Sequence, residues 1–149
     1  FPTRRYSDLG YTALLELERL DHCRTLTPSS LYRSDPVGPP GQPDYINAVA
    51  QLETTLEPLA FLDALQGIEQ QHQRVRIEHW GPRTLDLDLL LYGDKQINHE
   101  RLTVPHAYLH ERNFVLFPLA EIAPQLSIPP GKNLTNYLET CQKGTLERI

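Results

Sequence analysis

The stretch TLDLDLLLY, residues 84–92, constrains the fold of this chain more than any other part of the sequence. Leucine alternates with aspartate in its first half, and a period of two is typical of a β-strand. In such a strand Leu85, Leu87 and Leu89 would point to one face, while Asp86 and Asp88 would both point to the other. The sequence therefore predicts a leucine-rich buried strand that carries two neighbouring carboxylates on one of its faces.

Two carboxylates on one face of a strand form a candidate metal site. Their α-carbons would lie about 7 Å apart, so the side chains could converge on one cation or on two cations roughly 3.5 to 4 Å apart. Hard carboxylate oxygens favour Mg²⁺, which usually completes its coordination with water and substrate phosphate oxygens. Arg74, Arg76 and Arg83 precede the pair within a ten-residue span and could donate to phosphate oxygens. The combination favours the binding of a nucleotide.

Each part of this pattern also has a plainer interpretation. A D-x-D motif is short, and most such pairs lie at exposed strand ends or in loops, where water solvates them. Arginine clusters in loops are also solvated more often than they are functional. The metal interpretation is favoured here because the carboxylates lie in an apolar stretch and a Gly-Pro turn directly precedes Arg83.

Length and composition restrict the class of protein. The chain has 149 residues, which is enough for one domain with its own core and too few for two ordinary ones. Its net charge of -5 and its lack of a membrane-length apolar run give no reason to expect a nucleic-acid or membrane partner. Cys23 and Cys141 have the spacing of neither a zinc site nor a disulfide framework, and residues 1–10 lack the apolar core of a secretory signal. We therefore expect a single cytoplasmic domain that spans residues 1–149.

Hydrophobic periodicity predicts a mixture of helices and strands. Helices are expected over residues 13–23, from Pro58 to about His72, before Pro124 and near the C-terminus. Strands are expected at the start of SSLYRSDPVGPPGQP and over DYINAVAQLET, with a loop rich in proline and glycine between them. A polar loop rich in arginine should follow His72. The elements do not alternate regularly as strand, helix and strand, so an α+β sandwich is favoured.

Several separated motifs carry a resemblance to a known family. WGPRTLDLDLLL, preceded by GQPDYINA and RVR and followed by RLTVPHAYLHERNFVLFPLAEIAP, resembles the 6-hydroxymethyl-7,8-dihydropterin pyrophosphokinases of folate biosynthesis. The resemblance covers roughly residues 13 to 138. It implies a monomer with a ferredoxin-like α+β sandwich, in which helices pack on both faces of a mainly antiparallel sheet. It also implies that pyrophosphate moves from ATP to the pterin hydroxymethyl group and that AMP is released.

The resemblance assigns roles to the residues around the phosphates. Asp86 and Asp88 would hold two Mg²⁺ ions that bridge the ATP phosphates. Arg74, Arg76 and Arg83 match family arginines that approach those phosphates. The remaining ATP contacts would come from Gln66, Glu69, Trp80, Arg101, His106 and Arg112.

The same resemblance implies a slot for the pterin ring. The ring would stack between Tyr45 and Phe114, the Asn47 amide would read its polar edge, and the backbone near Val37 would complete the pocket. Without the resemblance, the two aromatic residues would more often be core residues and Asn47 a turn or edge residue.

The N-terminus departs from the family. Members normally begin with a central strand that runs into a Gly-Ser-Asn turn, and nothing in FPTRRYSDLGYT matches it. Residues 1–12 are therefore atypical, and the first central strand is expected to be missing. Two neighbouring strands would then have unpaired edges, and we expect the chain to be less stable than a full-length relative.

Two other functions remain open at the level of sequence. Another two-metal phosphate-transfer enzyme could use the same carboxylates and arginines, but it would not need a pterin slot. An inactive or truncated nucleotide-binding module of the same fold would bind ATP without forming AMP.

Overall fold

The computed structural model describes residues 12–35, 44–79 and 85–149. A helix covers residues 12–18. In chain order there follow β1 (Cys23–Pro28), β2 (Tyr32–Ser34), β3 (Tyr45–Asn47), β4 (Ala50–Thr54), α2 (Pro58–His79), β5 (Ile97–His99), β6 (Leu102–Val104), the 3-10 helix η1 (Leu109–Glu111), α3 (Asn113–Ile122), β7 (Ser127–Ile128), β8 (Lys132–Asn133), α4 (Leu134–Glu139) and β9 (Glu147–Arg148). Every strand pair among the described residues is antiparallel. The predicted α+β class is confirmed.

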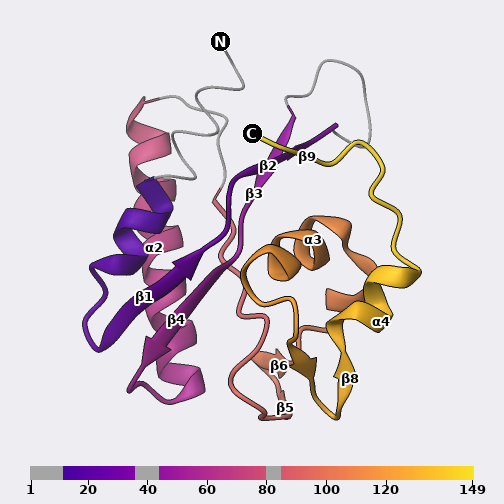
Figure 1. Ribbon diagram of the computed structural model, residues 1–149. Coiled ribbons are helices and arrows are strands. Elements are labelled where there is room, and N and C mark those ends of the chain that lie inside the picture. Colours follow the sequence, from indigo (N-terminus) through magenta and orange to yellow (C-terminus); the bar gives the residue numbers. More distant parts are fainter. Residues whose placement is uncertain (1–11, 36–43, 80–84) are drawn as a thin grey trace.

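The N-terminal strands form one long bent hairpin, which Figure 1 shows running beside α2 and up to β9. β1 pairs with β4, and β2 pairs with both β3 and β9. Between the two pairs the Ser29 hydroxyl accepts a hydrogen bond from the Val49 amide at 2.9 Å, and the Ser29 amide donates to the Val49 carbonyl at 2.7 Å. The strand predicted over DYINAVAQLET is therefore present but divided at Ala48 and Val49, because the serine hydroxyl replaces a backbone partner there.

Two of the predicted helices have different ends in the structure. α2 begins at Pro58 as expected, but it continues to His79 instead of ending near His72. Its last two turns, QRVRIEH, contain no glycine or proline, so helix propensity can sustain them although they lack the regular apolar stripe of the first turns. The arginine-rich loop expected after His72 is wrong over residues 73–79. The helix expected at residues 13–23 is shorter, because the chain turns before β1 begins at Cys23.

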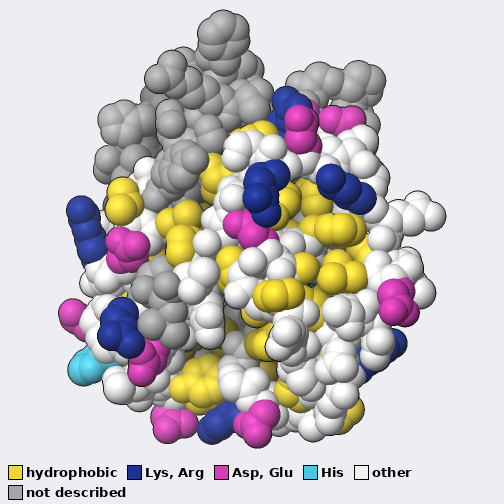
Figure 2. All heavy atoms as spheres, in the orientation of Figure 1, with side chains coloured by type: hydrophobic (Ala, Val, Ile, Leu, Met, Phe, Trp, Pro, Cys, Tyr) yellow, Lys and Arg dark blue, Asp and Glu magenta, His cyan; other side chains and the backbone are white. Residues whose placement is uncertain are grey.

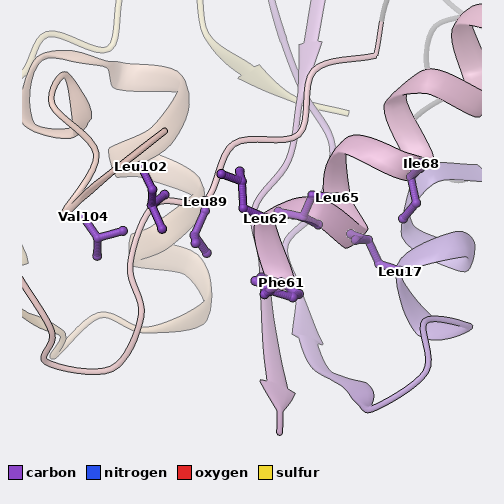
Figure 3. Packing of buried hydrophobic residues seen from close by; sticks show 8 residues of the cluster. All are labelled: Leu17, Phe61, Leu62, Leu65, Ile68, Leu89, Leu102 and Val104. Atoms are coloured by element: carbon purple, nitrogen blue, oxygen red, sulfur yellow. The ribbon is translucent and has the colours of Figure 1, made fainter. Parts of the chain in front are cut away.

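Two clusters of buried side chains form the core. The first joins residues 12–18, α2, residue 89 and β6, and Figure 3 shows its buried members, Leu17, Phe61, Leu62, Leu65, Ile68, Leu89, Leu102 and Val104. The second is built around α3 and includes Val49, Leu109, Val115, Leu116, Leu119, Ile128 and Leu134. Figure 2 shows hydrophobic side chains across the middle and right of one face, so part of the apolar side-chain surface of the protein remains in contact with water.

Residues 85–92 pair with no strand in the described part of the chain, which corrects the first expectation drawn from the sequence. Their backbone is held in other ways: the Leu87 amide donates to the Glu69 carboxylate, and the Leu90 carbonyl accepts from the His106 amide. Within the described residues β4 pairs only with β1, so no described strand lies between β4 and residues 85–92. A cavity of about 580 Å³ lies there, lined mainly by leucine, alanine and other apolar residues.

The C-terminal part contains short elements that were not expected from the sequence. β5 pairs with β6, β7 pairs with β8, and β9 joins the β2–β3 sheet. The predicted helix before Pro124 and the short final helix are confirmed as α3 and α4. Among the described helices, none is long and apolar enough to cross a membrane.

Candidate active site

The two candidate metal ligands are exposed on the same side of residues 85–89. Asp86 and Asp88 are exposed, whereas Leu85, Leu87 and Leu89 pack against the first core cluster. The alternation of faces predicted from the sequence is confirmed over this stretch, although the strand is not. The leucines thus anchor the backbone and leave both carboxylates accessible to a ligand.

Glu69 fixes the backbone between these two aspartates. Its Oε2 accepts a hydrogen bond from the Leu87 amide at 3.0 Å. Glu69 lies on α2, whose apolar side is buried through Leu65 and Ile68. A carboxylate on a rigid helix therefore holds the segment that carries Asp86 and Asp88.

Arg112 lies close to Asp88 and to two aromatic rings. One guanidinium nitrogen lies 3.9 Å from Asp88 Oδ2, and both side chains are partly exposed. The guanidinium carbon lies 5.5 Å from the Phe114 ring centroid and 5.4 Å from the Tyr108 ring centroid. A cation over two rings is attracted to their faces, so the two rings help to hold Arg112 beside Asp88.

His106 is oriented by its own backbone neighbours. The Tyr108 amide donates to His106 Nδ1 at 3.3 Å, and the centroids of the His106 and Tyr108 rings lie 6.3 Å apart. When Nδ1 accepts a hydrogen bond, the neutral ring carries its proton on Nε2. His106 can therefore donate from Nε2 to an anionic oxygen.

Gln66 and Arg101 come together on the exposed side of α2. Arg101 donates to Gln66 Oε1 at 3.0 Å and forms an ion pair with Asp63 at 2.5 Å. Two candidates that are 35 residues apart thus form one polar group. An exposed ion pair of this kind contributes little to stability, so its arginine can exchange partners with an incoming anion at small cost.

The pterin candidates are only partly assembled in the described residues. Asn47 lines the same cavity as Asp86 and Asp88. Phe114 lies at the start of α3 and packs against the second core cluster. Tyr45 is 45% exposed on β3.

Several candidates fall outside the described part of the structure. Val37, Trp80 and Arg83 lie outside the described residues. The backbone of Arg74 and Arg76 belongs to α2, but their side chains are not described. Their predicted roles remain predictions.

Two residues near the site were missed from the sequence. Tyr108 supplies a ring to Arg112 and an amide to His106, and Asp63 binds Arg101. The position of Tyr108, two residues after His106, was a usable signal. Asp63 could not have been found in this way, because its partner is 38 residues away in the sequence.

The bond between Glu69 and Leu87 gives a testable prediction. Because the carboxylate acts as an acceptor for a backbone amide, Glu69→Gln should retain turnover within about two-fold, while Glu69→Ala should lower kcat about ten-fold. Steady-state kinetics of the reaction that the sequence resemblance implies, with ATP as the varied substrate, checks this. Equal losses in the two variants would instead indicate that the negative charge of Glu69 itself is required.

Comparisons with known proteins identify the family of this chain. The family model for 7,8-dihydro-6-hydroxymethylpterin-pyrophosphokinase matches residues 7–124. A 2-amino-4-hydroxy-6-hydroxymethyldihydropteridine pyrophosphokinase from Pseudomonas aeruginosa is 50% identical over 137 residues, which are 92% of this chain and 85% of the relative. The enzyme of the same name from Haemophilus influenzae is 50% identical over 129 residues, which are 87% of this chain and 81% of the relative. The chain therefore belongs to the 7,8-dihydro-6-hydroxymethylpterin pyrophosphokinase family.

Proposed function

We propose that this chain transfers pyrophosphate from ATP to the hydroxymethyl group of 6-hydroxymethyl-7,8-dihydropterin, forming the pterin diphosphate and AMP. The observation that carries the proposal is the exposed pair Asp86 and Asp88, with Arg112 3.9 Å from the second carboxylate. Opposite charges meet there at an accessible surface, as the binding of a metal-bound triphosphate requires.

The donor set fits magnesium that is shared with a substrate. Among the residues that the structure describes, no group of three or more His, Cys, Asp and Glu side chains could hold a metal ion. Two carboxylates are enough for Mg²⁺ when phosphate oxygens and water fill the other positions. We therefore assign two Mg²⁺ ions to Asp86 and Asp88, where they would neutralise charge on the phosphates and align them.

The remaining residues would bind and orient the reactants. In the reaction the pterin hydroxyl oxygen forms a bond to the β-phosphorus, the bond from that phosphorus to the oxygen of the α-phosphate breaks, and the hydroxyl proton is released. Arg112 and the Nε2–H of His106 would hold phosphate oxygens, and Gln66 with Arg101 would lie along the nucleotide. Catalysis would come mainly from positioning and charge stabilisation.

Recognition of the pterin would rest on Asn47. Its amide offers both a donor and an acceptor, which matches the alternating polar edge of a pterin ring. Its place in the wall of the cavity that Asp86 and Asp88 also line supports this assignment. Tyr45 and Phe114 would supply the ring contacts, and the backbone near Val37 would complete the pocket.

Asn47→Ala should weaken pterin binding about ten-fold or more, because the buried polar edge of the ring would lose its partner. The affinity for ATP should stay within about two-fold. Isothermal titration with the pterin, in the presence of Mg²⁺ and an ATP analogue, measures this effect. Asn98→Ala, at an exposed position of β5, is the matched control.

This titration, together with an assay of AMP release from ATP, separates the proposed function from its alternatives. An unrelated two-metal enzyme would show no pterin binding that depends on Asn47. A nucleotide-binding module would bind ATP but would release no AMP when pterin and Mg²⁺ are added. The proposed function requires pterin-dependent AMP release by the unmodified chain.

A further inference from the structure

Glu121 collects hydrogen bonds from a different part of the chain. It lies in the last turn of α3, and its carboxylate accepts from the Ser30 amide at 2.9 Å, the Ser30 hydroxyl at 3.0 Å and the Tyr32 hydroxyl at 2.6 Å. Arg148 of β9 lies 3.2 Å from the same carboxylate. The Glu121 side chain is only 20% exposed. One carboxylate thus joins α3 to the residues at the start of β2.

The elements that Glu121 joins carry the two sides of the proposed pterin pocket. Tyr32 is the register partner of Asn47 in the β2–β3 pair. Ser29, next to Ser30, makes two hydrogen bonds with Val49, just beyond Asn47. The other end of α3 begins with Asn113 and Phe114. Figure 1 shows α3 beside the lower end of the β2–β3 pair.

We propose that Glu121 is a positioning residue for the pterin pocket, which it sets by holding the β2–β3 hairpin at a fixed distance from α3. The inference rests on the proposed function, since it assumes that Asn47 and Phe114 contact the pterin. Glu121 itself would not touch the substrate. Its effect passes through Tyr32 to Asn47 on one side, and along α3 to Phe114 on the other.

The chemistry of the contact explains why a carboxylate is needed. Three donors converge on two oxygens, and only an ionised carboxylate can accept from all of them. Burial raises the pKa of Glu121, but the hydrogen bonds from Tyr32 and Ser30 and the charge of Arg148 outweigh it and hold the pKa below 4.5. Burial, together with the bond to Glu121, raises the pKa of Tyr32 above 10.0, so its hydroxyl remains a donor at neutral pH.

Glu121→Gln tests the proposal because it preserves the shape of the side chain. The amide nitrogen would face the donor groups of Ser30 or Tyr32, so at least one bond is replaced by a repulsive contact. We expect the KM for the pterin to rise about ten-fold, with the KM for ATP and kcat changed less than about two-fold. Glu139→Gln, which makes the same change at an exposed position of α4, should leave all three constants unchanged.

A second variant separates positioning from folding. Tyr32→Phe removes one donor and keeps the buried ring, so the KM for the pterin should rise about three-fold while the protein stays folded. Thermal melts of each variant establish that the protein is folded at the assay temperature. If folded Glu121→Gln protein kept a normal KM for the pterin, or if both KM values rose equally, the positioning role would be overturned.

The outcome for Asn47→Ala shows which proposal has failed. If Asn47→Ala weakens pterin binding and Glu121→Gln does not, the pocket assignment stands and the positioning role is wrong. If neither variant affects the pterin, the assignment of the pocket to Asn47 is itself wrong.

Discussion

Asp88→Ala should lower the rate of pterin-dependent AMP formation about a thousand-fold. Asp88 supplies one of the two carboxylates in the proposed Mg²⁺ site, and it also faces Arg112 at 3.9 Å. Removing a ligand from a site that neutralises phosphate charge costs several kcal/mol in the transition state, and about 1.4 kcal/mol corresponds to each ten-fold loss. The assay measures AMP released from ATP at saturating Mg²⁺ and pterin.

The control for this prediction is Asp94→Ala. Asp94 is also exposed, and it follows Asp88 by six residues, in the turn after the leucine-rich segment. The change removes the same charge from the same part of the chain, so its rate should remain within about two-fold of the unmodified protein. A similar loss in both variants would mean that local negative charge, and not the metal site, governs the rate.

Leu116→Ala should lower the free energy of unfolding by about 2–5 kcal/mol. Leu116 is 0% exposed in the second core cluster, on the helix that also carries Phe114 and Glu121. Truncation would leave a cavity among side chains that cannot fully collapse into it. The loss is large compared with the stability of a domain of this size, and urea denaturation measures it.

Leu15→Ala is the matched control for the core prediction. Leu15 is 52% exposed on the helix over residues 12–18, so the same truncation should change stability by less than about 0.5 kcal/mol. Equal losses at both positions would show that burial on α3 does not determine stability. An unchanged midpoint of urea denaturation for Leu116→Ala would mean that the second core cluster does not hold α3 in place.

Local patterns predicted the features that depend on neighbouring residues. Pro58 begins α2 because proline fits the first turn of a helix, and α3 and α4 also follow the predicted order. The exposure of Asp86 and Asp88 on one side follows from alternation alone. In each case the determining forces act over only a few residues.

Features that depend on distant partners could not be predicted. Residues 85–92 have the composition of a buried strand, but a strand needs a neighbouring edge, and the structure bonds Leu87 to Glu69 instead. The break in DYINAVAQLET arises from Ser29, which lies 20 residues before Val49. The sequence predicts an end of α2 near His72, seven residues before its actual end at His79, because the last turns have no regular apolar stripe.

The residues of the candidate site also divide into those that the sequence predicted and those that it did not. Motif resemblance selected Asp88, Arg112 and Phe114, and the structure brings these three together. It did not select Tyr108, which contacts Arg112 of the same motif, or Glu121, which accepts a hydrogen bond from Tyr32 in a distant part of the chain. The contacts of Glu121 follow from tertiary geometry, which spacing along the chain does not encode.

We propose that Asp86 and Asp88 hold the metal ions for phosphate transfer. A titration with Mn²⁺, in the presence of α,β-methylene ATP and the pterin, tests it directly, because this analogue cannot be cleaved between its α- and β-phosphates. We expect about two bound Mn²⁺ ions per unmodified chain, and their loss in the double variant Asp86→Asn, Asp88→Asn. Unchanged Mn²⁺ binding by the folded double variant would contradict it.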